Sequence, residues 1–196
     1  MKLETAFRIR AFRQALEQAA AERRDEYRNL PRWCELSGFP CGSCDLASNF
    51  LARYLLDRDK GLYPLIVHIC GNNTFREAES STVHSHVIVM LDGNYIDLTL
   101  DQFEEYSEYI PAEQIESAGV VSSLISKILF HEGTVTNRPV VIGKGKQLYE
   151  CLSKSADTFL AEDPEMLARE RELDDFSKTV RNLLRFNDGH PPQKEN

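Results

Sequence analysis

The segment 84–99 constrains the fold more than any other part of the chain. It contains two apolar, β-branched runs, 84–91 and 94–99, with only Asp92-Gly93 between them. Asp-Gly at this position is typical of a two-residue hairpin turn, because its backbone matches the twist of the flanking strands. We therefore expect an antiparallel hairpin whose register is set by the turn.

This register decides which side chains share a face of the sheet. A two-residue turn places Val89 opposite Ile96, and therefore Asp97 opposite Ile88. Side chains two residues apart in a strand point to the same face, so His86 lies on the face of Ile88. Asp97 is then one diagonal step from His86, which is within reach of a ring side chain. We expect these two side chains to interact.

The rest of the pattern predicts an α+β fold. A single domain is expected over 1–187, with a core at about 31–143 and a disordered tail at 188–196. Helices are expected at 2–28, at 44–57, around 121–130, and at 146–160 and 164–186, so that the flanking helices occupy 2–28 and 146–186. Strands are expected at 65–70, 84–91, 94–99 and 140–142, loops at 31–43 and 72–83, and a short helix or turn at 101–109.

The composition limits the classes of partner. The chain has 23 Lys and Arg against 31 Asp and Glu, a net charge of −8. Nucleic acid and anionic membrane surfaces require a basic face, so both are disfavoured as partners. The first ten residues carry several charges and lack the apolar stretch of a secretory signal, and no window resembles a membrane span. The five cysteines are expected as reduced thiols in a cytoplasmic protein, or in an effector exported without a signal.

Cys44 is expected to begin the helix 44–57, with Ser43 as its N-cap. A cysteine at this position lies near the positive end of the helix dipole, which favours the nucleophilic thiolate. A histidine within hydrogen-bond reach can exchange a proton with the thiol, and a carboxylate can orient its ring. His86 and His84 are both candidates for the base, and Asp97 is the candidate for the orienting group.

Three motifs resemble the transglutaminase-like branch of the papain-fold cysteine enzymes. They are FPCGSCDLAS at 39–48, HVIV at 86–89 and IDLTLDQF at 96–103. The resemblance covers about a third of the chain. It implies a catalytic triad of Cys44 as nucleophile, His86 as base and Asp97 as orienter. It also implies an α+β papain-like core, with the cysteine helix packed on a small antiparallel sheet and no metal or organic cofactor.

The chain departs from this family at two points. Ile88 stands where many relatives have tryptophan, two places after the histidine. Papain has a glutamine shortly before its nucleophile as an oxyanion donor, whereas the nearest upstream glutamine here is Gln18. The backbone N–H of Cys44 is a candidate for one oxyanion donor. Trp33, Ser43 and Gln18 are candidates for the other.

Some of the same residues also match the patterns of other kinds of site. Cys41 and Cys44 match the Cys-x-x-Cys of dithiol redox proteins. A zinc site could draw its ligands from Cys34, Cys41, Cys44, His84 and His86. A papain-like binding module without catalysis is a further alternative.

The expected function is that of a thiol-dependent amide hydrolase or acyltransferase acting through a Cys44 thioester. Its substrate is expected to be a protein or peptide. Proteolysis, glutamine deamidation and transamidation share this acyl-enzyme and differ in the leaving group and in the second nucleophile. The sequence does not separate the three activities, and it leaves the oligomeric state open.

Overall fold

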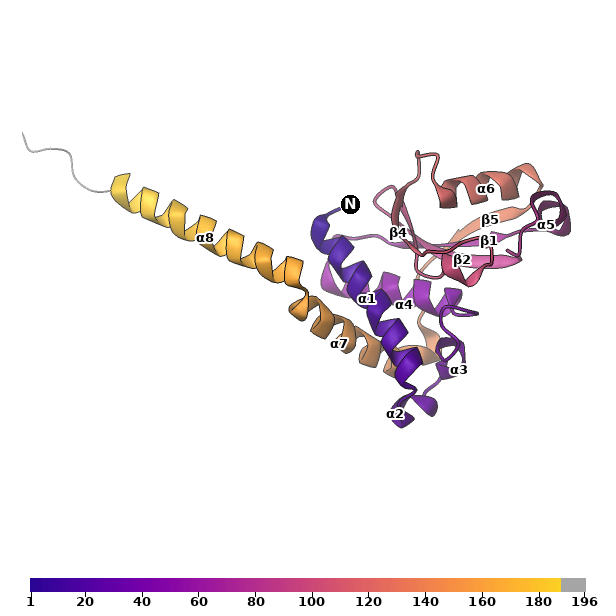
Figure 1. Ribbon diagram of the computed structural model, residues 1–196, viewed down its shortest axis with the longest axis horizontal. Coiled ribbons are helices and arrows are strands. Elements are labelled where there is room, and N and C mark those ends of the chain that lie inside the picture. The colour runs from indigo at the N-terminus through magenta and orange to yellow at the C-terminus, as the bar shows by residue number, and fades with distance from the viewer. Residues whose placement is uncertain (188–196) are drawn as a thin grey trace, which may run out of the picture. The chain divides into compact units, whose positions relative to one another are not determined.

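The computed structural model describes residues 1–187 (Figure 1), and the expected disordered tail at 188–196 lies outside the described residues. The fold is α+β, as expected from the sequence. The helices are α1 (Leu3–Glu22), α2 (Asp25–Arg28), α3 (Trp33–Leu36), α4 (Cys44–Arg58), α5 (Asn73–Glu79), α6 (Val120–Phe130), α7 (Lys146–Glu162) and α8 (Pro164–Asn187), with 3-10 turns η1 (Leu100–Gln102) and η2 (Gly143–Gly145). The strands are β1 (Leu65–Cys70), β2 (Ser85–Leu91), β3 (Asn94–Asp97), β4 (Ile110–Gln114) and β5 (Thr134–Arg138).

The sheet has five strands in the order β4-β3-β2-β1-β5, and all neighbours are antiparallel. Strands β2 and β3 form the expected hairpin. Asp92 and Gly93 both have positive φ, 48° and 71°, as the primed hairpin turn requires. Val89 pairs with Ile96, so the register predicted from the turn is confirmed.

Helices cover both faces of the sheet (Figure 1). One hydrophobic core contains residues of α1, α4 and α7 together with one face of the sheet. A second core contains residues of α5 and α6 together with other sheet residues. Burial of apolar surface on both faces holds the central strands in place, so the strands that carry His86 and Asp97 have little freedom to move.

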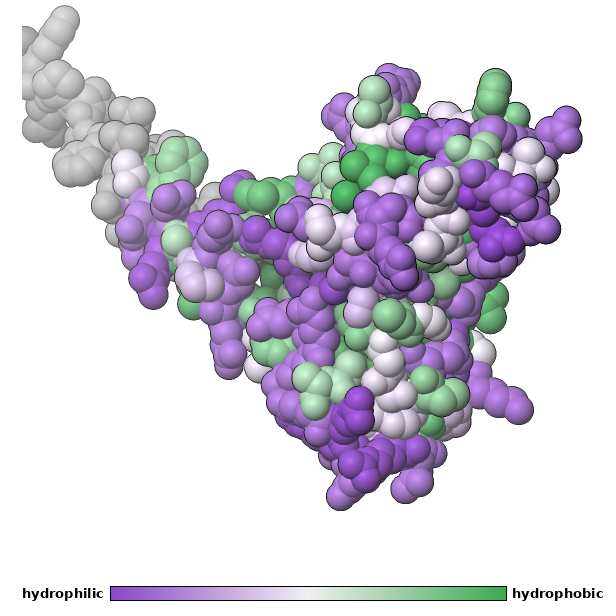
Figure 2. All heavy atoms as spheres, turned by 45° about the vertical axis from the view of Figure 1, so that its right-hand side comes forward, coloured by the Kyte–Doolittle hydropathy of each residue, from purple (hydrophilic) through white to green (hydrophobic). Residues whose placement is uncertain are grey.

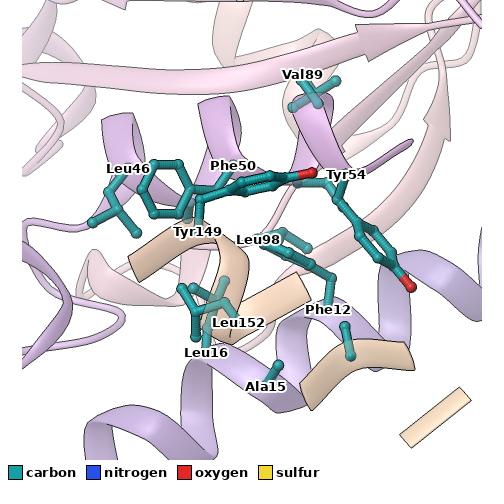
Figure 3. Close-up of a cluster of buried hydrophobic side chains, with 14 of the residues drawn as sticks. Phe12, Ala15, Leu16, Leu46, Phe50, Tyr54, Val89, Leu98, Tyr149 and Leu152 are labelled. Carbon is teal, nitrogen blue, oxygen red and sulfur yellow. The ribbon is translucent and has the colours of Figure 1, made fainter. Parts of the chain in front are cut away.

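Aromatic side chains fix α4 within the first of these cores (Figure 3). The rings of Phe12 in α1 and Tyr54 in α4 stack with centroids 5.0 Å apart. The rings of Phe50 in α4 and Tyr149 in α7 meet edge to face at 5.7 Å. Such pairs add to the energy of area burial and restrict how the helices slide. The position of α4, and with it Cys44, is therefore set by packing along the whole helix.

The expected helix at 2–28 is two helices. Arg23 takes a left-handed conformation with φ of 45°, and its backbone N–H donates to the carbonyl of Ala19. The chain then turns into α2, where Tyr27 is buried and its ring lies 5.9 Å from that of Trp33. Tyr27 lies after this break and belongs to the same hydrophobic core as the residues of α1.

Several short elements differ from the expectation. The expected loop at 72–83 contains α5, which Asn72 caps by accepting a 2.8 Å hydrogen bond from the N–H of Phe75. The expected loop at 31–43 contains the single-turn helix α3. Residues 140–142 form no strand, so this prediction is wrong. Strands β4 and β5 were not predicted. Both are edge strands with mostly exposed side chains, so they lack the apolar run by which a strand is recognised.

The chain divides into two compact units, Met1–Phe159 and a second that begins at Leu160. In the second unit, Asp163 caps α8. Its Oδ1 atom accepts hydrogen bonds from the backbone N–H groups of Glu165 and Met166 at 2.9 and 3.1 Å. The single domain expected over 1–187 stays a prediction.

The visible surface is largely hydrophilic, with apolar residues in patches between charged ones (Figure 2). Phe130 and Tyr63 are the most exposed of the large apolar side chains described, at 82% and 81%. Within residues 1–187, no helix combines the length and the apolar character that crossing a membrane requires.

Arg13 joins α1 to the segment that follows β3. Its side chain is 7% exposed, and one of its nitrogens lies 2.7 Å from Oδ2 of Asp101. It also donates to the carbonyl of Leu98, and its guanidinium lies over the rings of Phe39 and Tyr109. A buried guanidinium that bonds to both sides in this way holds α1 against the strand end.

We predict that Arg13→Met lowers the free energy of unfolding by about 3 kcal/mol, because it leaves a partly buried carboxylate and a carbonyl without their donor. The matched control is Arg53→Met, since the Arg53–Asp57 pair lies within α4 and is more exposed. Its loss is expected to cost about 0.5 kcal/mol. Urea unfolding of both variants measures the difference, and equal losses would contradict the anchoring role of Arg13.

Candidate active site

Cys44 is the first residue of α4 and is half-buried. Ser43 occupies the N-cap position, but its hydroxyl does not cap the helix. It donates instead to the backbone carbonyl of Glu35 at 2.5 Å. The first turn of α4 therefore has no side-chain cap, and its positive end remains available to a negative charge near the sulfur of Cys44.

A buried hydrogen bond attaches α4 to β2 one turn after Cys44. The hydroxyl of Ser48 donates to the carbonyl of Val87 at 2.7 Å. Ser48 lies four residues after Cys44 and so on the same face of the helix, and Val87 is the neighbour of His86 in β2. This contact places the start of α4 beside the histidine.

His86 and Asp97 form the expected pair. The Nε2 atom of His86 lies 2.6 Å from Oδ2 of Asp97, and the two side chains are 0% and 1% exposed. The other carboxylate oxygen, Oδ1, accepts a 3.0 Å hydrogen bond from the backbone N–H of Thr99. Both oxygens are thus engaged, so the carboxylate fixes the orientation of the ring.

Opposing effects act on the pKa of His86. Burial lowers the pKa of His86, but the charge of Asp97, its hydrogen bond and the interaction with Cys44 together raise the pKa from 6.5 to about 9. Since Asp97 takes Nε2, Nδ1 is the ring nitrogen that remains for the interaction with Cys44. A histidine partner and an uncapped helix start are the two features that activate nucleophilic cysteines in general, and both are present at Cys44.

Two residues of the segment after β3 complete the surroundings of the ring. The ring of Phe103 meets that of His86 edge to face, with centroids 4.9 Å apart. Nε2 of Gln102 lies 3.3 Å from Nδ1 of His86, and its Oε1 accepts from the backbone N–H of Gly42 at 3.1 Å. Gln102 therefore contacts both the histidine and the loop that precedes Cys44.

The other candidate for the base, His84, lies outside this arrangement. His84 is exposed, and its ring contacts the guanidinium of Arg76. His68 contacts a different thiol: its Nε2 lies 2.8 Å from the hydroxyl of Ser85 and 3.4 Å from the sulfur of Cys70. His86 is thus the histidine that the structure brings to Cys44.

The three side chains considered for the second oxyanion donor are engaged elsewhere. Gln18 donates to Glu22 within α1 at 2.7 Å. Trp33 packs against Tyr27, and the hydroxyl of Ser43 points back to the carbonyl of Glu35. Gln102 is the glutamine that reaches the site. The signal available in the sequence was the Asp-Gln-Phe that ends the third motif.

The cysteines form no disulfide, and Cys34 and Cys41 are exposed. Across residues 1–187, no group of three or more His, Cys, Asp or Glu side chains is arranged to hold a metal ion. The residues considered for zinc are separated accordingly: His84 contacts Arg76, whereas His86 is paired with Asp97.

A charged network surrounds the first turn of α4. Asp45, directly after Cys44, binds Arg32 of the preceding loop at 2.7 Å and also pairs with Arg138 at the end of β5. Arg138 donates to Asn49 as well, at 3.0 Å. With Ile142 among its other lining residues, this network borders a pocket of about 400 Å³. The helix start is therefore held from two sides, next to a space lined by charged and apolar residues.

Comparisons with known proteins place the chain near uncharacterized relatives. It is 35% identical over 127 residues to the uncharacterized protein YuaU of Escherichia coli strain K12, and equally to YuaU of strain UTI89 / UPEC. The match covers 65% of this chain and 55% of each relative, so the chain spans about half the length of the curated relatives it matches. No protein-family model and no solved structure matches the chain.

Proposed function

We propose that the chain is a thiol-dependent amide hydrolase or acyltransferase with a papain-like fold of the transglutaminase-like branch. Cys44 is the nucleophile, His86 the acid–base group and Asp97 the orienting carboxylate. The observation that carries the proposal is the buried ring of His86, bonded to Asp97 through Nε2 and facing Cys44 with Nδ1. A thiol nucleophile is activated by an adjacent histidine whose ring is oriented by a third group.

The reaction begins with the thiolate of Cys44 and the imidazolium of His86. The sulfur attacks the carbonyl carbon of an amide, and a C–S bond forms as the carbonyl oxygen becomes negative. The C–N bond then breaks, and the Nδ1 proton of His86 passes to the departing nitrogen. This leaves a thioester on Cys44 and a neutral ring whose Nδ1 can accept a proton from the second nucleophile, water or an amine.

The negative oxygen of the tetrahedral intermediate needs nearby donors. The backbone N–H of Cys44 lies at the start of α4, which has no side-chain cap, and this N–H is suited to the role. The partial positive charge of the helix end adds to the stabilisation. In this proposal the start of α4 supplies one of the donors.

Proteins and peptides are the proposed substrates. Hydrolysis of a peptide bond, deamidation of a glutamine and transamidation all pass through the same thioester. The pocket bordered by Arg32, Asp45 and Arg138 includes Asp45, the residue after Cys44, and combines charged with apolar lining residues. Proposed partners are limited to such substrates.

The first prediction concerns alkylation of Cys44. Iodoacetamide at pH 7 is expected to modify Cys44 faster than the exposed thiols of Cys34 and Cys41, because a free thiol is mostly protonated at this pH. His86→Ala removes the cation beside the sulfur and should slow the alkylation of Cys44 by roughly tenfold or more. Peptide mass spectrometry over a time course gives the rate at each cysteine.

The matched control is His68→Ala, which removes the histidine beside a different thiol, Cys70. It should leave the rate at Cys44 unchanged. Equal alkylation rates at all accessible cysteines, or a rate at Cys44 that does not change in His86→Ala, would contradict the catalytic proposal. The alternative of a binding module with the same fold would then be favoured.

The second prediction tests acyl transfer directly. The activated ester p-nitrophenyl acetate should acetylate Cys44 with release of one nitrophenolate, because the thiolate displaces a good leaving group. Cys44→Ala should abolish this modification, and Asp97→Asn should slow it by about tenfold to a hundredfold by loosening the ring. Intact-protein mass spectrometry detects the acetyl group. Acetylation that persists in Cys44→Ala would assign the reactivity to another residue.

The third prediction concerns the pH dependence of stability. Folding raises the pKa of His86 from 6.5 to about 9, so the folded state binds this proton more tightly than the unfolded state. The resulting stabilisation is complete below pH 6.5 and is lost as the pH rises through about 9. Relative to His86→Gln, the wild type should lose up to about 3 kcal/mol of unfolding free energy across this range. Urea unfolding at a series of pH values checks this, and parallel curves would contradict it.

A further inference from the structure

Gln102 makes three contacts at the proposed site. Its Oε1 accepts from the backbone N–H of Gly42 at 3.1 Å, and its Nε2 donates to the carbonyl of Thr99 at 2.9 Å. The same Nε2 lies 3.3 Å from Nδ1 of His86. One side chain therefore joins the loop before the nucleophile, the segment after β3 and the ring of the histidine.

These contacts fix which end of the amide faces the ring. A backbone N–H only donates and a carbonyl only accepts, so exchanging Oε1 and Nε2 would oppose two donors at Gly42 and two acceptors at Thr99. The donor end of Gln102 thus faces His86. An N–H can bond to Nδ1 only when that nitrogen carries a lone pair, which is the neutral ring with its remaining proton on Nε2 beside Asp97.

The neutral ring of this kind is the species that the proposed reaction forms. Once the imidazolium has given its Nδ1 proton to the leaving group, the sulfur of Cys44 is part of a thioester and no longer attracts the ring as an anion. Gln102 is then placed to donate to the bare Nδ1. At 3.3 Å this bond is longer than the other two, so an incoming water can displace it.

The support of Gln102 is rigid. It ends η1, whose neighbour Asp101 is held by the buried Arg13 of α1. On the loop side, Gly42 has φ of +68°, a conformation that favours glycine. The next residue, Ser43, is fully buried and bonded to the carbonyl of Glu35. A side chain held from both ends keeps its geometry while the ring changes its protonation state.

We infer that Gln102 is a positioning residue: it ties the nucleophile loop to the histidine and holds the neutral ring of His86 during the acyl-enzyme stage. This inference rests on the proposed function. It goes beyond the triad, because it assigns a fourth side chain to the step after the leaving group has departed.

The test compares Gln102→Met, which keeps the size of the side chain without its polar groups, with Gln102→Asn, which keeps the amide but is one methylene too short to bridge. The control is Gln147→Leu, at an exposed glutamine on α7. Three quantities are measured: the alkylation rate of Cys44, the rates of acetylation and deacetylation with p-nitrophenyl acetate, and the ¹⁵N chemical shift of Nδ1 of His86 above pH 9.

Both variants should still be labelled selectively at Cys44, with a rate about threefold to tenfold lower because the loop is no longer tied to the histidine. Deacetylation should slow more than acetylation, since the neutral ring loses its donor. The ¹⁵N signal of Nδ1 should move toward that of an imidazole nitrogen without a hydrogen bond. The control should match the wild type in all three measurements.

The inference is overturned if both variants keep the wild-type rates and the wild-type ¹⁵N shift, or if only thermal stability changes. If Gln102→Met does not fold, Gln102→Asn decides by the same measurements. Failure of the proposed function looks different, because Cys44 would then not be labelled selectively in the wild type and His86→Ala would have no effect on its rate.

Discussion

The buried contact between His86 and Asp97 is the interaction on which the rest of the site depends. Removing an imidazolium and a carboxylate from water is costly, and only close pairing with further hydrogen bonds offsets that cost. Here the carboxylate bonds to the ring on one oxygen and to the N–H of Thr99 on the other. The pairing raises the pKa of the ring and leaves Nδ1 free of Asp97. Removing either partner would leave an uncompensated charge among apolar side chains.

Cys44 is positioned relative to this pair by packing along the whole of α4. Aromatic contacts with α1 and α7 fix the helix within the core, and Ser48 bonds it to the backbone of β2 at Val87. Cys44 lies one turn earlier on the same helix face, beside the histidine. The fold thus uses a large apolar interface to set the distance between two small polar groups, which local interactions alone would leave loose.

Features of the fold that local interactions determine could be predicted from the sequence, whereas features that depend on contacts between distant segments could not. The hairpin register was predictable because a two-residue Asp-Gly turn admits one pairing, and the period of two then decided the faces of His86 and Asp97. The start of α4 at Cys44 was predictable from apolar periodicity. The edge strands β4 and β5 were not, because their side chains are largely exposed and their pairing uses backbone groups. Asn72 is a residue type that often caps helices, so the start of α5 could have been predicted from the sequence, but it was not.

By itself, the sequence determined the local geometry of three candidate groups: a cysteine at a helix start, and a histidine and an aspartate on one face of a hairpin. Only the tertiary structure decided between His84 and His86, and only it brought Gln102 to the site. Both outcomes depend on contacts between segments distant in the chain, such as the bond from Gln102 to Gly42. Such contacts are set by how α1, α4 and the sheet pack together, and no local propensity records them.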